Sequence, residues 1–339
     1  MPKDKENGFR KVTSVDVAKH AGVSRSAVSR TFTPNASVSA GTREKVLKSA
    51  AQLGYRVNKL ASSLTNNRSD LVGIVASNID NPFRVSQIEA LSRELMKHNL
   101  KPILLVVEGS EDPSHIIGML LEYNVSGVIV TSDTPPQSIC EECVALGVPM
   151  VLVNKAQSST AVDRVLLDNK KSGELAAQEL YDTGCRTMAV VTTEQASYSL
   201  RVRIESFVNH CSTLGIEKVA FFRGEKQDYQ GGQRAAMQLH RSTNTIQGVF
   251  CASDYLALGF MDYLRLEQGV PSLSDLKIVS CDDIAQASWP IYNLSTIRQD
   301  TAILAQNVVQ VLQQRIAKPN IEAAVTILDV TLVQRGTTR

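Results

Sequence analysis

The stretch Val12–Phe32, VTSVDVAKHAGVSRSAVSRTF, contains the local signals of two short helices with a tight turn between them. Thr13 and Asp16 have the spacing of a capping box, in which each side chain bonds the backbone N–H of the other residue. This spacing predicts a helix over about 14–20. Gly22 then suits the turn, because glycine adopts left-handed backbone angles without a steric penalty. The stretch therefore begins with a capped helix that ends sharply.

Two more helices are expected after the turn. Ser24 is a good N-cap for a second helix over about 25–33, and two short helices joined by a glycine turn form a helix-turn-helix. A third helix is expected over 40–53, where Val46 and Ala50 lie on one apolar face. That face would cover the first two helices, so the sequence predicts a small all-α head with a three-helix core.

The charge of the chain is divided unevenly. Residues 1–68 contain 13 Lys or Arg and 4 Asp or Glu, a formal charge of +9, whereas the remaining residues carry 23 basic and 30 acidic side chains, a formal charge of −7. A basic head on an acidic body indicates an anionic polymer as the partner of the head. The alternative is a three-helix module that docks only onto another protein, and such a module would not need this positive charge.

These segments resemble the DNA-binding head of the lactose-repressor (LacI/GalR) family. The resemblance runs almost without gaps through 12–32, through 38–55 (VSAGTREKVLKSAAQLGY) and through 58–64 (NKLASSL). It implies that the second helix enters the major groove of double-stranded operator DNA with its N-terminal residues against the base edges. The DNA contacts that it implies are Thr13, Ser24, Arg25, Ser26, Ser29, Arg30, Asn35, Asn58, Lys59, Ala61 and Leu64.

The implied contacts divide into those that read bases and those that hold phosphates. Arg25 and Ser26 occupy the specificity positions of the family, and an arginine can bridge both acceptors of a guanine. Arg30 lies one turn further along and suits a base or a phosphate equally. The other head contacts are expected on phosphates, which set the register without reading sequence; they are Thr13, Ser24, Ser29 and Asn35. Ser24 also suits the role of a helix cap alone.

The segment 58–65 corresponds to the hinge of the family. There it is a short helix that becomes ordered on DNA and pairs with its symmetry mate in the minor groove. Leu64 matches the leucine that is wedged between base pairs, and such a wedge kinks the duplex. The small residues 61–63 would permit close pairing of two hinge helices. The alternative is an ordinary linker with one incidental leucine.

From Leu71 onward, apolar runs alternate with helical stretches. Four runs precede Asp168: LVGIVAS at 71–77, KPILLVV at 101–107, GVIVTS at 127–132 and VPMVLVN at 148–154. Four more follow it: TMAVVTT at 187–193, KVAFF at 218–222, GVFCAS at 248–253 and LKIVSCD at 276–282. This alternation predicts an α/β fold with parallel sheets covered on both faces. Two comparable sets predict two lobes, with a ligand between them at the carboxyl ends of the strands.

The body is also similar, more weakly, to the effector domain of the same family, which resembles periplasmic sugar-binding proteins. That resemblance implies three chain crossings between the lobes, near 154–168, 293–298 and 323–330. The expected organisation is a helix-turn-helix head over 1–57, a hinge or linker over 58–68 and a two-lobed effector and dimerisation domain over 69–339. Its first lobe would comprise about 69–160 and 298–325, and its second lobe about 161–297 and 326–339.

The resemblance also implies a set of effector-binding residues near the strand ends. Arg203 matches the arginine that binds hydroxyl or carboxylate groups in relatives, and its fixed fork can engage two acceptors. Asp282 matches an acidic ligand contact, whereas Asp254 is expected to brace the loop. Phe83 follows the first strand, where its ring would stack on a ligand or fill the core. The complete expected set is Phe83, Asn154, Arg203, Ser253, Asp282 and Trp289.

The sequence departs from the family pattern close to this pocket. Ser280 and Cys281 stand where relatives commonly have a glycine and an aromatic residue, and Arg84 follows Phe83 where a second aromatic residue is frequent. Trp289, the only tryptophan, lies beside the second crossing and is expected to line the cleft. The expected effector is therefore small and polar. A sugar or sugar derivative is one candidate, and the departures argue against a standard sugar.

Other classes of protein fit the sequence less well. No phosphate-binding loop, dinucleotide fingerprint, nucleophile elbow or HExxH motif is present, so we expect neither catalytic residues nor a cofactor. The pair Cys140 and Cys143 has no second pair or histidine cluster to complete a zinc shell. The sequence contains no secretory signal and no apolar run of membrane-spanning length, which predicts a cytoplasmic location. A periplasmic solute-binding protein would need export and would have no use for the basic head.

Taken together, these features predict a transcription regulator, a repressor in the first instance, that binds a palindromic operator as a homodimer. A small effector in the cleft would shift the lobes and change the spacing of the hinges. No leucine heptads follow the last family segment at 331–339, so we expect a dimer rather than a coiled-coil tetramer. An activator or a regulator that needs a co-repressor stays an alternative, because the sign of coupling depends on which conformation binds the ligand more tightly.

Overall fold

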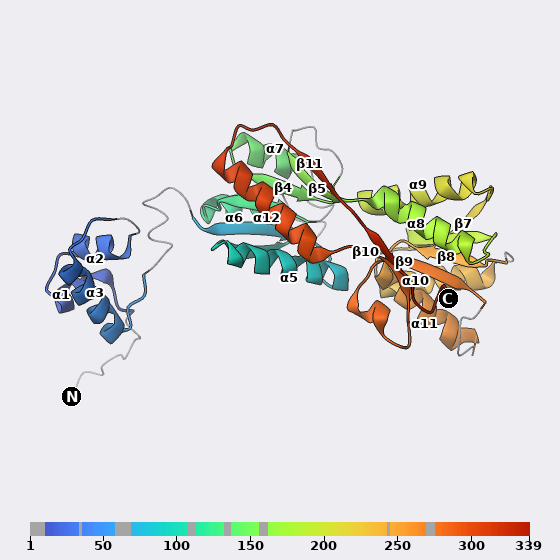
Figure 1. The fold of residues 1–339 in the computed structure, drawn as a ribbon, viewed down its shortest axis with the longest axis horizontal. Helices are drawn as coiled ribbons and strands as arrows, with labels where there is room; N and C mark the ends of the chain where they lie inside the picture. Colours follow the sequence, from blue (N-terminus) through green and yellow to red (C-terminus); the bar gives the residue numbers. More distant parts are fainter. Residues whose placement is uncertain are drawn as a thin grey trace, which may run out of the picture. The chain divides into compact units, whose positions relative to one another are not determined.

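A computed structural model describes residues 11–33, 36–57, 69–107, 113–131, 137–155, 162–242, 245–268 and 275–339. The chain divides into two compact units, residues 1–67 and residues 68–339 (Figure 1). Five of the expected DNA contacts lie outside the described residues: Asn35, Asn58, Lys59, Ala61 and Leu64.

The first unit contains three helices: α1 (Ser14–Ala21), α2 (Arg25–Phe32) and α3 (Ala40–Leu53). The predicted capping box is confirmed, since the Thr13 N–H donates to Asp16 Oδ2 at 2.9 Å and the Thr13 side chain accepts from the Asp16 N–H. Gly22 ends α1 with a φ of 65°, and Gly54 ends α3 with a φ of 66°. Local signals therefore located all three helices to within a residue or two.

The core of the first unit is small and forms where the three helices meet. It consists of Val17, Ala18, Val28, Val46 and Ala50, all buried. The aromatic rings of Phe32 and Tyr55 pack around it with their centroids 5.8 Å apart. These few side chains hold α2 on the outside of the unit with one face buried and the other free.

The second unit contains two six-stranded sheets, one in each lobe. The first sheet has the strand order β11 (Val325–Leu328), β5 (Asp163–Leu167), β4 (Met150–Val153), β3 (Gly127–Val130), β1 (Leu71–Ala76) and β2 (Lys101–Val106). All of its strand pairs are parallel. One face is covered by α5 (Pro82–Lys97) and α12 (Thr301–Ala317), and the other by α6 (Pro113–Glu122) and α7 (Gln137–Ala145).

The second sheet has the strand order β12 (Thr331–Val333), β10 (Ser295–Arg298), β9 (Lys277–Asp282), β8 (Gly248–Cys251), β6 (Met188–Thr193) and β7 (Val219–Gly224). One face packs on α8 (Asn169–Asp182) and α9 (Tyr198–Thr213), and the other on α10 (Tyr229–Arg241) and α11 (Asp254–Gln268). A short 3-10 helix, η1 (Ala285–Ser288), follows β9. The predicted parallel sheets are confirmed, with one antiparallel pair, that of β12 with β10, at the edge of the second sheet.

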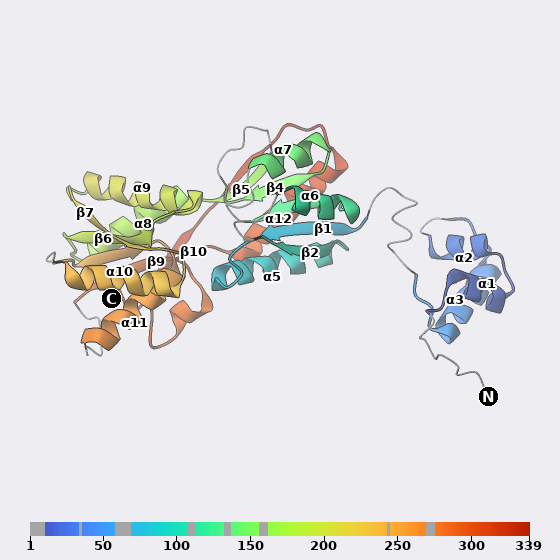
Figure 2. The same cartoon turned by 180° about the vertical axis from the view of Figure 1, so that it is seen from behind.

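The chain crosses between the lobes three times, slightly later at each point than the predicted lobe boundaries imply. β5 pairs with β4 and β11 pairs with β5, so both strands belong to the first sheet. The first lobe therefore extends through 163–167 and 325–328. The polar residues at the start of β5 obscured this strand in the sequence. Asp163 is buried, and Arg315 of α12 donates to both of its oxygens, at 2.8 and 3.0 Å. Figure 2 shows the crossing segments from behind.

The Cys140–Cys143 pair lies on α7 and points into the core of the first lobe. Burial raises the pKa of the Cys143 thiol to about 12, so the thiolate that metal binding or redox chemistry needs is disfavoured. Within the described ranges, no group of three His, Cys, Asp or Glu side chains is arranged to hold a metal ion. In the same part of the chain, no helix is long and apolar enough to cross a membrane.

Candidate functional site

The outer face of α2 in the first unit is polar and carries only positive formal charge. Arg25, Ser26, Ser29 and Arg30 are all exposed, whereas Val28 on the same helix is buried. Positions i, i+1, i+4 and i+5 share one side of an α-helix, so these four side chains form a single surface. No acidic residue occurs in α2. This surface therefore suits a partner that presents phosphates and hydrogen-bonding edges.

The hydroxyl groups expected to touch phosphate also cap the helices. Ser24 Oγ accepts the Ala27 N–H at 3.2 Å and lies 2.8 Å from Ser26 Oγ. Thr13 Oγ1 donates to Asp16 Oδ2 at 2.7 Å. Both hydroxyls remain on the exposed surface at a helix N-terminus, where the helix dipole favours an anion. The capping role and the phosphate-binding role are therefore compatible.

Arg43 on α3 fixes the far end of α2, a role that the sequence did not reveal. Its Nη1 donates to the Thr31 carbonyl at 2.9 Å and its Nη2 to the Ala36 carbonyl at 3.4 Å. A cation at the last carbonyls of a helix satisfies groups that have no partner within the helix. The orientation of α2 thus depends on α3.

The second unit contains a pocket lined by residues of both lobes. It encloses about 450 Å³ free of protein atoms, part of it open to solvent. The first lobe contributes Asn81, Phe83, Arg84, Gln87, Thr131 and Asn154, and the second contributes Ser197, Ser199, Leu200, Arg203, Gln227 and Asp282. Most of these side chains are polar, so the pocket is built for a small molecule that forms hydrogen bonds.

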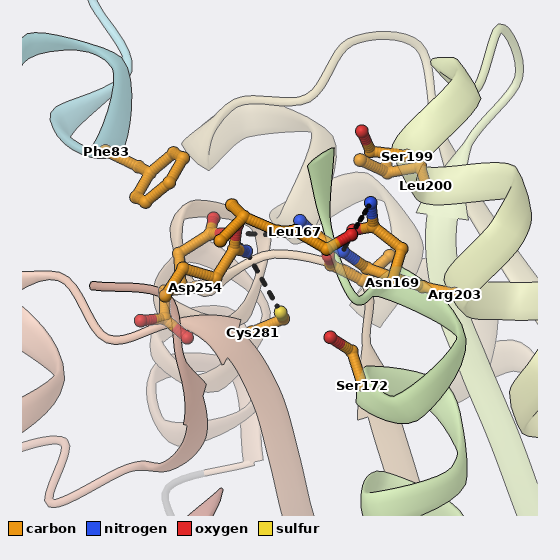
Figure 3. A network of polar contacts seen from close by, with 12 residues as sticks. Phe83, Leu167, Asn169, Ser172, Ser199, Leu200, Arg203, Asp254 and Cys281 are labelled. Carbon is orange, nitrogen blue, oxygen red and sulfur yellow. Dashed lines mark hydrogen bonds and ion pairs between the residues drawn. The ribbon is translucent and has the colours of Figure 1, made fainter. Parts of the chain in front are cut away.

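Arg203 is the most constrained of these side chains. It is 3% exposed, and its Nε donates to Asn169 Oδ1 at 2.7 Å (Figure 3). Its Nη1 donates to the Ala252 carbonyl at 3.0 Å and to Asp282 Oδ1 at 3.3 Å. Among the described residues, nothing accepts a hydrogen bond from Nη2. The guanidinium is therefore held rigidly with one nitrogen available to a ligand.

Asp282 lies at the end of β9, with a backbone φ of 132°. Its Oδ1 accepts from Gln299 Nε2 at 2.7 Å, as well as from Arg203. Burial raises the pKa of the Asp282 carboxyl to about 7, although the neighbouring Arg203 charge opposes this shift. Gln299 lies in the crossing between β10 and α12. The carboxylate of the pocket is thus tied to a segment that joins the two lobes.

The loop after Asp282 is braced from several sides. The Asp254 carboxylate accepts the Ile284 N–H at 2.9 Å and the Thr296 hydroxyl at 2.6 Å, as its expected bracing role requires. Asp283 has a φ of 55° and accepts from Arg298 Nε and from Arg335 Nη2, each at 2.6 Å. These contacts fix the backbone on which Asp282 is presented.

Two residues of the first lobe reach toward the second. The Phe83 ring packs against both apolar clusters of the second lobe and approaches the pocket from the start of α5 (Figure 3). Asn154 has a φ of 55°, and its Oδ1 accepts the Leu167 N–H at 2.8 Å. Its carbonyl accepts from the Ser199 hydroxyl at 3.1 Å. Both residues therefore connect the lobes at the pocket.

Comparison with protein families matches each unit of the chain. Residues 14–58 match the family of bacterial regulatory proteins of the lacI type, and residues 177–338 match the periplasmic binding protein-like domain. The chain therefore contains a helix-turn-helix domain of the lacI type followed by a periplasmic binding protein-like domain. The resemblance found in the helix-turn-helix sequence is confirmed, as is the two-lobed α/β fold.

Known members of the lacI family are similar over almost the whole chain. The ribose operon repressor of Lactococcus lactis subsp. lactis (strain IL1403) is 27% identical over 330 residues, which cover 96% of this chain and 98% of the relative. A crystal structure of the Lac repressor dimer bound to operator and the anti-inducer ONPF has a TM-score of 0.87 at 27% identity, covering 97% and 99% of the two chains.

A third relative shares the two-lobed unit. The lacI-family regulator from Enterococcus faecium with bound ribose has a TM-score of 0.71 at 27% identity, covering 79% of this chain and 98% of that one. All three relatives are named as repressors or transcriptional regulators rather than as enzymes.

The pocket of this chain brings together four of the six expected effector contacts: Phe83, Asn154, Arg203 and Asp282. Ser253 is fully buried and does not line the pocket. Trp289, expected in the cleft, is 50% exposed and stacks on Tyr292 instead, with the ring centroids 6.4 Å apart. Trp289 directly follows the 3-10 helix η1 as its C-cap, and its position in the sequence beside a crossing did not show that it would lie outside the pocket lining.

Several pocket residues were missed from sequence. Gln87 lies one turn after Phe83 on α5, and Ser197 caps α9, so the helix-start pattern around each could have indicated them. Gln299, in a crossing, donates a hydrogen bond to Asp282. Asn169, at the start of α8, accepts one from Arg203. No local pattern marks these two, because their role depends on the meeting of distant segments.

Proposed function

We propose that this protein is a cytoplasmic, sequence-specific transcription repressor. It binds a palindromic operator as a homodimer, and a small polar effector in the interlobe pocket controls its affinity for DNA. The exposed face of α2 carries this proposal, because Arg25 and Ser26 stand at the first turn of a helix that has two arginines and no carboxylate. A DNA-reading helix needs such side chains at its N-terminus.

The edges of the two sheets support a second copy of this chain as partner. β2 and β7 are outermost strands of their sheets, and Leu104, Val106 and Phe221 on them are exposed. Val85 and Met96 on the neighbouring α5 are exposed as well, at 49% and 57%. Exposed apolar edges are normally covered by a partner. The similar Lac repressor is a dimer on its operator, so a symmetric partner is the occupant we propose.

The interlobe pocket supports control by a small molecule. Its side chains come from both lobes, so a ligand that binds them stabilises one arrangement of the lobes over another. The named relatives include a ribose operon repressor and a regulator with bound ribose, which makes carbohydrates and their derivatives candidate effectors. Ligand binding in this pocket requires no chemical reaction, and we propose no enzymatic activity.

A regulator that activates transcription or needs a co-repressor is the second candidate. It would use the same face of α2 and the same pocket, because the sign of coupling depends only on which lobe arrangement the ligand prefers.

The test is selection of the purified full chain against a random DNA pool, with sequencing of the bound fraction. We expect enrichment of a palindrome, and light scattering should give two chains per duplex. The selection is repeated with Arg25→Ala and with Lys48→Ala, which removes an equal charge from an exposed site on α3. Arg25→Ala should change the selected sequence and Lys48→Ala should not. Equal, sequence-independent binding by all three proteins would contradict the proposal.

Adding candidate effectors to the selected duplex separates the two directions of control. Release of DNA by a ligand supports a repressor that is induced. Binding that appears only in the presence of a ligand supports the co-repressor alternative.

A further inference from the structure

The turn after β9 contains two successive residues with positive φ angles. Asp282 has a φ of 132° and Asp283 a φ of 55°, and neither is a glycine. A φ of 55° lies in the left-handed region that aspartate tolerates, whereas 132° lies outside that region and is rare for any residue with a Cβ. Such conformations persist only where the surrounding structure enforces them. The turn therefore depends on contacts that hold it.

The Asp283 carboxylate is bound by two arginines that come from distant parts of the chain. Its Oδ2 accepts from Arg298 Nε and its Oδ1 from Arg335 Nη2, each at 2.6 Å. Arg298 ends β10, and Arg335 lies in the segment after β12. The Asp283 side chain is 9% exposed and that of Arg335 is 15% exposed. Hydrogen bonds between charged groups are roughly twice as strong as neutral ones, so these contacts brace the turn firmly.

Arg335 is itself fixed, so it can serve as an anchor. Its Nη1 donates to the Leu294 carbonyl at 2.8 Å, and its backbone N–H donates to Ser295 Oγ at 2.7 Å. Two residues later, the Thr337 hydroxyl donates to the Ile278 carbonyl at 2.7 Å. Ser295 begins β10 and Ile278 belongs to β9. The guanidinium at the turn is thus attached to both of the neighbouring strands.

The conformation of this turn places Asp282 in the pocket. The Asp282 carboxylate lines the pocket and accepts hydrogen bonds from Arg203 and Gln299. The backbone angles of Asp282 set the direction of its side chain, so relaxation toward a common φ would turn the carboxylate away from both donors. Neither Asp283 nor Arg335 lines the pocket. The route from Arg335 to the pocket therefore runs through the turn.

We infer that Arg335 is a positioning residue of the effector pocket. Acting through Asp283, it holds the turn after β9 in the conformation that places the Asp282 carboxylate in the pocket. This rests on the proposed function, because the pocket is the proposed effector site, and it adds the segment after β12 to the parts of the chain that form that site. A purely structural ion pair would stabilise the second lobe and leave the environment of Asp282 unchanged.

The titration of Asp282 separates these two roles. Burial is the largest cause of the raised pKa of Asp282, and the charges of Arg203, Asp254 and Arg84 act on it as well. If the turn relaxes, the carboxyl group reaches solvent and its pKa falls toward the ordinary value of 3.8. If Arg335 acted on Asp282 only as a nearby positive charge, its removal would raise the pKa instead. The direction of the change therefore identifies the mechanism.

The experiment is an NMR titration of the purified full chain with aspartate labelled at the carboxyl carbon, from about pH 4 to about pH 9. The signal of Asp282 is the one that is missing from Asp282→Asn. Its midpoint should be about 7 in the parent protein. In Arg335→Met the midpoint should be lower by about one pH unit or more. Arg335→Lys keeps the charge and should recover part of this shift.

Asp283→Asn tests the same turn from the other side of the ion pair. The change keeps the shape of the side chain and removes the charge that both arginines bind, so the midpoint of Asp282 should fall as it does in Arg335→Met. Thermal melting of each variant reports whether it is folded. If Arg335→Met does not fold, Asp283→Asn and Arg335→Lys provide the comparison with the parent protein.

Arg315→Met is the matched control. Arg315 donates to both oxygens of the buried Asp163 in the first lobe, at 2.8 and 3.0 Å, and neither residue lines the pocket. Its side chain is 14% exposed, close to the value for Arg335. Loss of this ion pair should lower the melting temperature and leave the midpoint of Asp282 unchanged.

Three results would overturn the inference: a midpoint of Asp282 that Arg335→Met leaves unchanged or raises, an equal fall in Arg315→Met, or a parent protein in which Asp282 already titrates near the ordinary value. The selection of DNA is independent of all three. A protein that selects a palindrome and shows no fall in Arg335→Met keeps the proposed function and loses the positioning role. One that shows the fall but selects no DNA loses the proposed function and keeps the role of Arg335 at the turn.

Discussion

The outer face of α2 and the interlobe pocket both present arginines, but they hold them in opposite ways. Arg25 and Arg30 are exposed and have no ion pair among the described residues. Arg203 is 3% exposed and fixed by three hydrogen bonds. An exposed arginine adapts to phosphates and bases along a polymer, and salt screens its charge. A buried arginine is preorganised for one small ligand, and its partners must be present for the protein to be stable.

Arg203→Met would test the rigid half of this comparison and should have the largest effect. Methionine removes the Arg203 donor from the Ala252 carbonyl and the positive charge beside the buried Asp282 carboxylate, which keeps only its hydrogen bond from Gln299 among the described residues. Removal of one member of a buried ion pair costs about 3–5 kcal/mol, so we expect a loss of that size in the free energy of unfolding. Urea denaturation of the full chain measures it.

Arg201→Met on the exposed side of the same helix is the control and should change the free energy of unfolding by less than about 0.5 kcal/mol. The double variant Arg203→Met with Asp282→Asn should recover part of the loss, because the buried charge is then gone. Equal stabilities of Arg203→Met and Arg201→Met would break the contrast between the two regions.

Arg25→Ala would test the exposed half. An arginine that bridges a guanine contributes about 1–3 kcal/mol of discrimination, so operator affinity should fall by that amount with almost no change in stability. Fluorescence anisotropy on the selected operator measures the affinity. Lys48→Ala should cost less and should leave the ranking of operator sequences unchanged.

Salt should weaken binding at the two regions to different extents. Raising the concentration from about 50 mM to about 200 mM should weaken operator binding by orders of magnitude, because phosphate contacts release counterions. Binding of the effector in the enclosed pocket should respond much less. A similar salt dependence at both sites would contradict the difference in screening.

The pH dependence of stability should distinguish the pocket. The pKa of Asp282 is about 7 in the folded protein, against 3.8 for an ordinary Asp side chain, because burial disfavours the charged form. The folded state therefore binds more protons between these values, and the stability associated with protonated Asp282 is lost as the pH rises through 7. The charged and acidic groups around it are Arg203, Arg84 and Asp254.

Asp282→Asn cannot titrate at this position, so it should gain stability relative to the parent protein between pH 5 and pH 8. We expect a relative gain of about 2–3 kcal/mol, measured by the melting of both proteins over that range. A relative gain that is flat, or that falls with rising pH, would show that Asp282 is already ionised in the folded protein at pH 5.

Thr13→Ala should have the smallest effect, and it probes the capping that positions the head. The change removes the side-chain half of the capping box of α1, which is worth about 1 kcal/mol. Hydrogen exchange of the α1 amides in the full chain should accelerate, while exchange in α5 stays as it was. If α1 exchanged no faster than in Lys48→Ala, tertiary packing rather than the cap would hold this helix.

Local signals in the sequence determined the first unit almost completely. Thr13, Ser24, Gly22 and Gly54 act through their own backbone and the next few residues, so their effect is visible without a tertiary structure. The alternation of strands and helices after Leu71 is equally local, because each period reflects one element alone. The family motif in 12–32 adds the function of the exposed side chains of α2.

The pocket depended on the tertiary structure. Strand alternation indicated where the strand ends would gather, and the resemblance pointed to Arg203 and Asp282. Neither signal showed that Gln299 would bind Asp282 or that Trp289 would lie outside the pocket lining. Membership of β5 in the first sheet and the antiparallel pairing of β12 are likewise set by partners far away in sequence. The raised pKa of Asp282 arises from burial among those partners. Caps and periodicity act within a few residues, whereas burial, sheet pairing and charge balance exist only once distant segments have met.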